Sequence, residues 1–214
     1  MNLRSLLAAL ALLPSLVFAQ DRDVFKAPER TRDVGFDTPG DRRRSAEAAV
    51  VNVCREYVKA QLQYAQQDRD HDGVREYAQY FLSAGGKRDG LYDTVKGGGE
   101  GSPLWQFIGR AQDQGFFAKL GRGRSPYLGY YFAILKKQGA NAPGGARDYM
   151  VGTHLTGGFA LIAWPAKYGD SGINTFLVNQ SGRILQKDLG PDTAKLAKKI
   201  TSYDPDANWT PATY

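Results

Sequence analysis

One long amphipathic pattern constrains this sequence more than any other feature. Between residues 45 and 67, apolar residues recur at spacings of three and four, which places them on one face of a helix. Ser45 is the expected N-cap. Such a helix has to bury its apolar face against another element. The expected core-facing residues, among which Gln61 is the one polar member, are Ala46, Ala49, Val50, Val53, Cys54, Tyr57, Val58, Gln61 and Tyr64.

The second half of the chain has the composition of a sheet. Aromatic and apolar runs predict strands over residues 127–135, 157–164, 172–179 and 183–188. The Asn-Gln-Ser-Gly sequence at 179–182 predicts a turn that joins the last two strands as a hairpin. Shorter helices are predicted over 76–83, 103–114 and 191–201. The fold class is therefore α+β, with a long N-terminal helix packed on an antiparallel sheet and extra short helices and loops.

The first 19 residues are typical of a secretory signal peptide. Arg4 supplies the positive charge, an apolar run follows, and Ala19 provides a small residue for cleavage before Gln20. Residues 20–44 are rich in charge and predict a flexible tether, 45–209 a single globular domain, and 210–214 a C-terminal tail. The apolar run is too short to span a bilayer. We expect a periplasmic or secreted protein with no transmembrane helix after signal cleavage.

Composition excludes several classes of function. The chain has 28 Lys and Arg against 22 Asp and Glu, and these charges are interspersed rather than gathered into a basic stripe. We therefore expect no nucleic-acid partner. With one cysteine the chain has no internal disulfide, and with two histidines it has no His-rich metal centre. Cys54 lies on the apolar helix face, which predicts a buried structural thiol.

The sharpest local signal is an acidic loop that follows the long helix. In Asp-Arg-Asp-His-Asp-Gly-Val-Arg-Glu, at 68–76, carboxylates alternate ahead of a turn-forming glycine, as in calcium loops. Gln79 stands at the twelfth position, where a high-affinity loop has a bidentate Glu, so any calcium site would be weak. A plain Asp/Gly turn fits the same residues. The candidate ligands are Asp68, Asp70, Asp72, the Val74 carbonyl and Glu76.

No pattern in the sequence indicates a catalytic nucleophile. His154 follows Asp148 and Tyr149 closely, but the chain lacks a Gly-x-Ser-x-Gly elbow. Aromatic residues could line a glycan-binding surface, and they fit a core equally well. Paired carboxylates for glycoside cleavage remain an alternative, because their spacing is set in three dimensions. The aromatic residues in question are Trp105, Tyr127, Tyr130, Tyr131, Trp164 and Tyr168.

Several segments together resemble a bacterial exported family, the domain of unknown function 2950. They include Asp-His-Asp-Gly-Val-Arg-Glu-Tyr-Ala at 70–78, Gln-Gly-Ala-Asn-Ala-Pro-Gly-Gly-Ala at 138–146 and Gly-Gly-Phe-Ala-Leu-Ile-Ala-Trp-Pro-Ala-Lys-Tyr-Gly at 157–169. The resemblance covers about residues 46–209. It implies an envelope or secreted protein, and it carries no known catalytic residues.

A weaker resemblance is to the globular headpieces of type IV pilins and pseudopilins. It rests on the long helix, on Glu-Tyr-Ala at 76–78 and on Ser-Gly-Ile-Asn-Thr-Phe-Leu-Val-Asn-Gln-Ser-Gly-Arg-Ile at 171–184. It implies a helix packed on an antiparallel sheet. Pilins keep an apolar N-terminal helix with a Glu near its start, whereas the apolar run here has no acidic residue.

The sequence thus favours a non-catalytic binding or structural module of the cell envelope. Its partner would be another envelope protein or a glycan, and its candidate cofactor is calcium. Two alternatives remain open at this stage. One is a cell-wall or glycan-active enzyme that uses paired carboxylates, and the other is a pseudopilin-like subunit of a secretion system.

Overall fold

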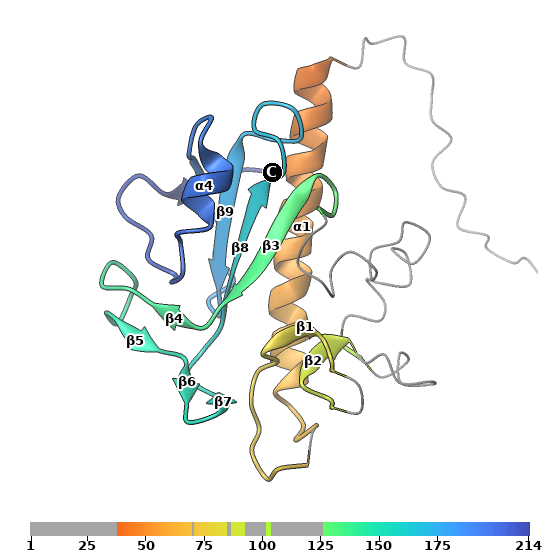
Figure 1. Ribbon diagram of the computed structural model, residues 1–214, viewed down its shortest axis with the longest axis vertical. Helices are drawn as coiled ribbons and strands as arrows, with labels where there is room; N and C mark the ends of the chain where they lie inside the picture. Colours follow the sequence, from red (N-terminus) through yellow and green to blue (C-terminus); the bar gives the residue numbers. More distant parts are fainter. Residues whose placement is uncertain (1–37, 70, 85–86, 93–101, 104–125) are drawn as a thin grey trace, which may run out of the picture. The chain divides into compact units, whose positions relative to one another are not determined.

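A long helix, α1 (Pro39–Tyr64), packs on a five-stranded sheet in the computed structural model of the protein (Figure 1). The structure describes residues 38–69, 71–84, 87–92, 102–103 and 126–214. These residues belong to one compact unit, Asp37–Tyr214. The helix and the largely antiparallel sheet confirm the predicted α+β class.

Helix α1 begins six residues before the expected N-cap, Ser45. Thr38 caps it instead, because its Oγ1 accepts from the Asp41 amide at 3.1 Å while the Asp41 carboxylate accepts from the Thr38 amide at 3.2 Å. Pro39 then occupies the first helical position, where its missing N–H is not needed. Residues 39–44 of the predicted tether are therefore helical. The helix ends at Tyr64 rather than near Gln67.

The central sheet has the strand order β11-β10-β9-β8-β3. All of its pairs are antiparallel. The predicted hairpin is confirmed as β9 and β10, and its turn closes with a hydrogen bond from Gly182 N to Asn179 O at 2.9 Å. Gly182 has a φ of +74°, which favours glycine at this position. The strands are β3 (Tyr130–Leu135), β8 (Ala160–Pro165), β9 (Asn174–Asn179), β10 (Leu185–Asp188) and β11 (Thr210–Pro211).

The three shorter sheets lie outside this central one. Two of them are hairpin-like antiparallel pairs, and β1 and β2 pair in parallel. The prediction of a helix over residues 76–83 is wrong, because this segment is extended and contains β1. The short strands are β1 (Tyr80–Leu82), β2 (Gly90–Tyr92), β4 (Lys137–Gln138), β5 (Arg147–Asp148), β6 (Met150–Val151) and β7 (His154–Leu155).

Helix and sheet are joined through a buried core. The Tyr57 hydroxyl donates to the Ala160 carbonyl at 3.2 Å, and the Tyr57 ring meets Phe159 edge-on at 5.7 Å between ring centroids. Residues 175–178 of β9 are fully buried, as expected for a strand covered on both faces. Helix α4 (Thr193–Ala197) is shorter than the predicted 191–201 helix and packs against β8.

The last five residues belong to the fold rather than to a tail. Strand β11 extends the sheet by pairing with β10, and Ala212 N donates to Ile184 O at 3.0 Å. The Tyr214 hydroxyl reaches back to the buried carboxylate of Glu47 on α1. Residues 210–214 therefore help to fasten the helix to the sheet.

Among the described residues, no helix has the length and apolarity needed to cross a membrane. The predicted signal peptide, most of the predicted tether and residues 104–114 of the predicted helix 103–114 lie outside the described residues.

Candidate metal site

A polar cavity of about 650 Å³ opens where the acidic loop after α1 meets the β6–β7 hairpin. Its lining combines acidic, basic and histidine side chains, so it suits a charged ligand better than an apolar one. The described residues that line it are Arg69, His71, Asp72, Glu76, Gln79, Tyr80, Lys87, Arg88, Asp89, Thr153 and His154.

Three ligating side chains converge in the wall of this cavity. Asp72, Glu76 and His154 each offer one ligand atom, and these atoms lie within 4.8 Å of one another. His154 Nδ1 is 3.3 Å from Asp72 Oδ2 and 3.8 Å from Glu76 Oε2. Two stretches of chain far apart in sequence supply the group, which is the only one of three or more such side chains among the described residues.

Glu76 is the most firmly held of the three ligating residues. Its side chain is only 7% exposed, and its Oε2 accepts from the Leu155 amide at 2.7 Å. A second hydrogen bond, from Tyr77 N to Leu155 O at 2.9 Å, joins the segment that contains Glu76 to β7. Because Leu155 follows His154 on β7, these bonds fix the Glu76 carboxylate beside the imidazole.

Gln79 ties the cavity wall to neighbouring elements. Its Nε2 donates to the Thr153 carbonyl at 2.6 Å, and its Oε1 accepts from Lys136 Nζ at 3.0 Å. The Lys136 ammonium also lies 4.8 Å from the centroid of the Tyr80 ring. The residue that replaces the bidentate Glu of a calcium loop is therefore a structural link between the cavity and Lys136, the residue that follows β3.

The acidic loop is closed by its own hydrogen bonds. Asp68 accepts from the Gly73 amide at 2.9 Å and from the Asp72 amide at 3.2 Å. Partial desolvation raises the pKa of Asp68, but these amide bonds outweigh it and the pKa lies below its ordinary value. The turn requires positive φ angles at His71 (62°) and Gly73 (91°), and glycine adopts this conformation without strain.

The structure brings together two of the five candidate calcium ligands. Asp72 and Glu76 meet beside His154, whereas the Asp68 carboxylate faces the amides of its own loop. Asp72 Oδ1 accepts from the Val74 amide at 2.8 Å, which leaves Oδ2 toward His154. Asp70 lies outside the described residues. Calcium binding by this loop stays a prediction.

His154 is the ligating residue that sequence reasoning missed. Its place in the sequence near Tyr149 and Asp148 suggests a candidate catalytic group, and it does not indicate a partner of the acidic loop. The two segments meet through long-range contacts, among them the bonds of Leu155 to Glu76 and Tyr77, which local sequence does not reveal. The sequence does contain one signal. The chain has only two histidines, and because His71 lies in the acidic loop, the other one, His154, was a candidate to join the same site.

The aromatic residues do not form one exposed platform. Tyr130 and Trp164 are buried in the core, and Tyr127, Tyr131 and Tyr168 are half-buried. Trp105 lies outside the described residues. Cys54 is buried as predicted, with 1% exposure, and burial raises the pKa of its thiol to about 12.

Comparison with known families gives one match. The family described as "Protein of unknown function (DUF2950)" matches residues 40–212, which is more than half of the chain. The comparisons with curated proteins and with solved structures gave no match.

Proposed function

The chain belongs to the DUF2950 family of proteins of unknown function, and we propose that it is an exported, non-catalytic module that binds a divalent cation. The observation that carries this proposal is the convergence of Asp72, Glu76 and His154 in the wall of a polar cavity. Export is proposed from the signal-like residues 1–19, with the periplasm or the medium as the destination. The partner would be an envelope protein or a glycan.

The donor set favours zinc over calcium. One imidazole nitrogen and two carboxylate oxygens are ligands that zinc accepts, whereas calcium prefers oxygen ligands alone. Tetrahedral zinc with bonds of about 2.0–2.2 Å places its ligand atoms roughly 3.3 Å apart. The distances of 3.3 and 3.8 Å from His154 Nδ1 to the two carboxylates are close to this spacing, and all three ligand atoms lie within 4.8 Å of one another.

The surroundings of the triad also suit a metal. Ligating carboxylates in metal sites are held by second hydrogen bonds, and the Leu155 amide supplies one to Glu76. Burial of Glu76 keeps its carboxylate in a fixed position, while Asp72 stands nearer to solvent. Three protein ligands leave room for a fourth ligand from the cavity.

The glycan-active alternative has less support from the described residues. The cavity that contains the Asp72 and Glu76 carboxylates has no tryptophan in its described lining, and Tyr80 is the one aromatic residue there on which a sugar ring could pack. The pseudopilin alternative depends on retention of the N-terminal apolar run. Mass spectrometry of the exported protein tests this, since a chain that begins at Gln20 contradicts the pseudopilin alternative.

Isothermal titration of the full chain with zinc chloride, followed by calcium chloride, tests the proposed site. We expect one zinc ion per chain, and we expect Glu76→Gln and His154→Gln to weaken zinc binding by at least about tenfold. His71→Asn is the matched control, because it removes the other histidine of the cavity and asparagine tolerates the positive φ. Unchanged zinc affinity in both Glu76→Gln and His154→Gln would refute the triad.

The calcium arm separates the two cation hypotheses. Asp68→Asn removes a candidate calcium ligand that stands outside the triad. Calcium binding that is lost in this variant while zinc binding persists would establish the loop site predicted from sequence. If neither metal binds the native protein, the cation proposal fails as a whole.

A further inference from the structure

A second cavity, of about 420 Å³, lies between the sheet and the α4 segment. Its walls are largely apolar, with Ala133, Ile162 and Trp164 from the sheet and Ala197 and Ile200 from the α4 side. Alternation along β3 places Ala133 on the opposite face from Tyr130, whose hydroxyl reaches Glu47 on α1. The cavity therefore opens on the sheet face that α1 does not cover. Its volume is within the usual range of small-molecule sites.

The indole of Trp164, in the wall of this cavity, carries an unmatched hydrogen-bond donor. Trp164 is 8% exposed, and its buried Nε1 has no hydrogen-bond partner among the described residues. Buried tryptophan N–H groups usually find an acceptor, because an unsatisfied one loses its hydration without compensation. A polar group on a bound ligand would supply such an acceptor once the indole turns, because Nε1 is enclosed in the conformation shown.

Thr175, next to Trp164, has a second unmatched polar group. The Oγ1 of Thr175 is also buried without a partner among the described residues. Thr175 lies one step beyond the Ala163–Phe176 pair in the β8–β9 register, which places it beside Trp164 on the same face. Two adjacent polar groups at this point of the apolar face thus lack partners.

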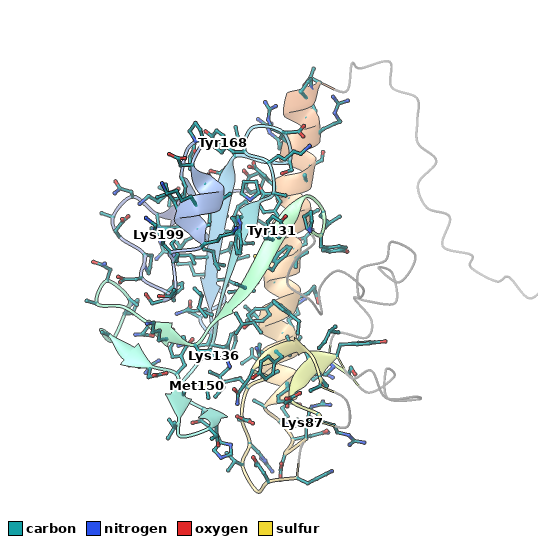
Figure 2. All side chains as sticks on the ribbon, viewed as in Figure 1. Lys87, Tyr131, Lys136, Met150, Tyr168 and Lys199 are labelled. Carbon is teal, nitrogen blue, oxygen red and sulfur yellow. The ribbon has the colours of Figure 1, made fainter. Side chains whose placement is uncertain are left out.

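The charges around the cavity are of one sign. Its charged lining residues in the described part of the chain are Lys136 and Lys198. Lys136 Nζ already binds Gln79, whereas Lys198 is exposed near the rim. Figure 2 shows Tyr131 and Lys136 near the two ends of β3, and Lys199, the residue that follows Lys198, on the α4 side. An anionic group on a bound molecule would be favoured at this rim.

We infer that this cavity binds a medium-chain free fatty acid. The alkyl chain packs against the apolar walls, and the carboxylate supplies the negative charge that Lys198 favours and, once the indole turns, the acceptor that the Trp164 N–H lacks. This cavity is distinct from the proposed cation site, and the inference does not rest on cation binding. A neutral alkane would leave the indole donor unmatched, and a sugar would bury hydroxyl groups against apolar walls.

Isothermal titration of the full chain with decanoate tests the inference, with decanol as the neutral counterpart. Trp164→Phe keeps an aromatic ring and removes the N–H, so decanoate affinity should fall by about tenfold. Trp209→Phe is its matched control, since Trp209 does not line the cavity. Lys198→Gln should weaken decanoate by up to about fivefold and leave decanol unchanged, with Lys199→Gln as its control.

A cavity-filling variant completes the test. Ala133→Phe places a ring in the cavity and should abolish decanoate binding, while thermal melts establish that each variant is folded. The inference is overturned if decanoate does not bind the native chain, or if it binds the folded Ala133→Phe and Trp164→Phe variants as tightly as the native one.

Discussion

Gln61 on α1 and the backbone of Ala78 are joined by two hydrogen bonds. Gln61 Nε2 donates to Ala78 O at 2.9 Å, and Gln61 Oε1 accepts from Ala78 N at 2.8 Å. The side-chain amide of Gln61 thereby pairs with the extended backbone at Ala78 in the way that a neighbouring strand would. Both residues are fully buried. Because Glu76 and Gln79 flank Ala78, this contact also fixes the wall of the polar cavity.

Replacing Gln61 by leucine should destabilise the protein strongly. The change leaves the Ala78 N–H and C=O buried without partners, and each such group costs about 1–3 kcal/mol. We expect the free energy of unfolding to fall by about 3 kcal/mol, with a decrease in Tm of roughly 6–12 °C. Urea unfolding measures the first quantity. Gln63→Leu, on the exposed side of the same helix, should change stability by no more than about 0.5 kcal/mol.

Glu47 makes a second polar contact between α1 and the sheet. Its Oε1 accepts from the amides of Ile173 and Asn174 at 2.8 and 2.9 Å, and from the Tyr130 hydroxyl at 3.3 Å. Tyr214 donates to the other carboxylate oxygen. All of these partners are donors, so the site is matched to an ionised carboxylate.

Glu47→Gln should therefore cost about 3 kcal/mol of unfolding free energy, because an NH₂ group would face donors and the charge that strengthens these bonds would be lost. Chemical denaturation of native and variant chains measures the difference. Glu56→Gln provides the comparison, since Glu56 pairs with Lys59 on the outer part of the same helix and should contribute under about 1 kcal/mol. Equal effects at the two positions would contradict the assigned role of Glu47.

Alkaline pH should remove the stability that the hydrogen bond between Tyr214 and Glu47 contributes. Burial, together with the hydrogen bond to Glu47, raises the pKa of Tyr214 from 10.0 to about 12. The unfolded chain releases this proton near pH 10 while the folded chain retains it, so the contribution to stability is complete below pH 10 and is lost as the pH rises toward 12. Denaturation midpoints across this range should fall less steeply in Tyr214→Phe. Parallel curves for the two proteins would exclude the linkage.

The Cys54 thiol should report global unfolding. It is 1% exposed, and burial raises its pKa to about 12, so the native protein contains neither an accessible nor an ionised thiol at neutral pH. We expect no reaction with a thiol reagent in buffer and full reaction in concentrated urea, followed by mass spectrometry. Labelling of the native chain at the rate of a free thiol would show that the α1 face opens locally.

The elements that local periodicity specifies were predictable. The α1 face, the β9–β10 hairpin and the strand within residues 172–179 follow from spacing and turn residues that lie within a few positions of each other. The family assignment is confirmed over residues 40–212. Helix α1 begins before Ser45 because Thr38 and Asp41 form a capping box. The first turns that follow this box are charged, so apolar spacing does not reveal them.

The errors have a common physical cause in tertiary contacts. Tyr77, Tyr80 and Phe81 have a spacing that suits a helix, but Gln61 and Leu155 bind the backbone of this segment and hold it extended. The same long-range contacts place His154 beside Glu76. Residues 210–214 resemble a tail in composition, and their strand pairing with β10 depends on a partner far from them in sequence.

Lys136 stands between the two cavities. The residue lines the apolar cavity, and its ammonium group contacts Gln79 and Tyr80 in the wall of the polar one. An occupant of either cavity that changes these contacts acts on the other cavity through a single side chain. Thermodynamic reciprocity then requires that each occupant alter the affinity for the other by the same factor, so that two separate pockets would respond as one linked receptor.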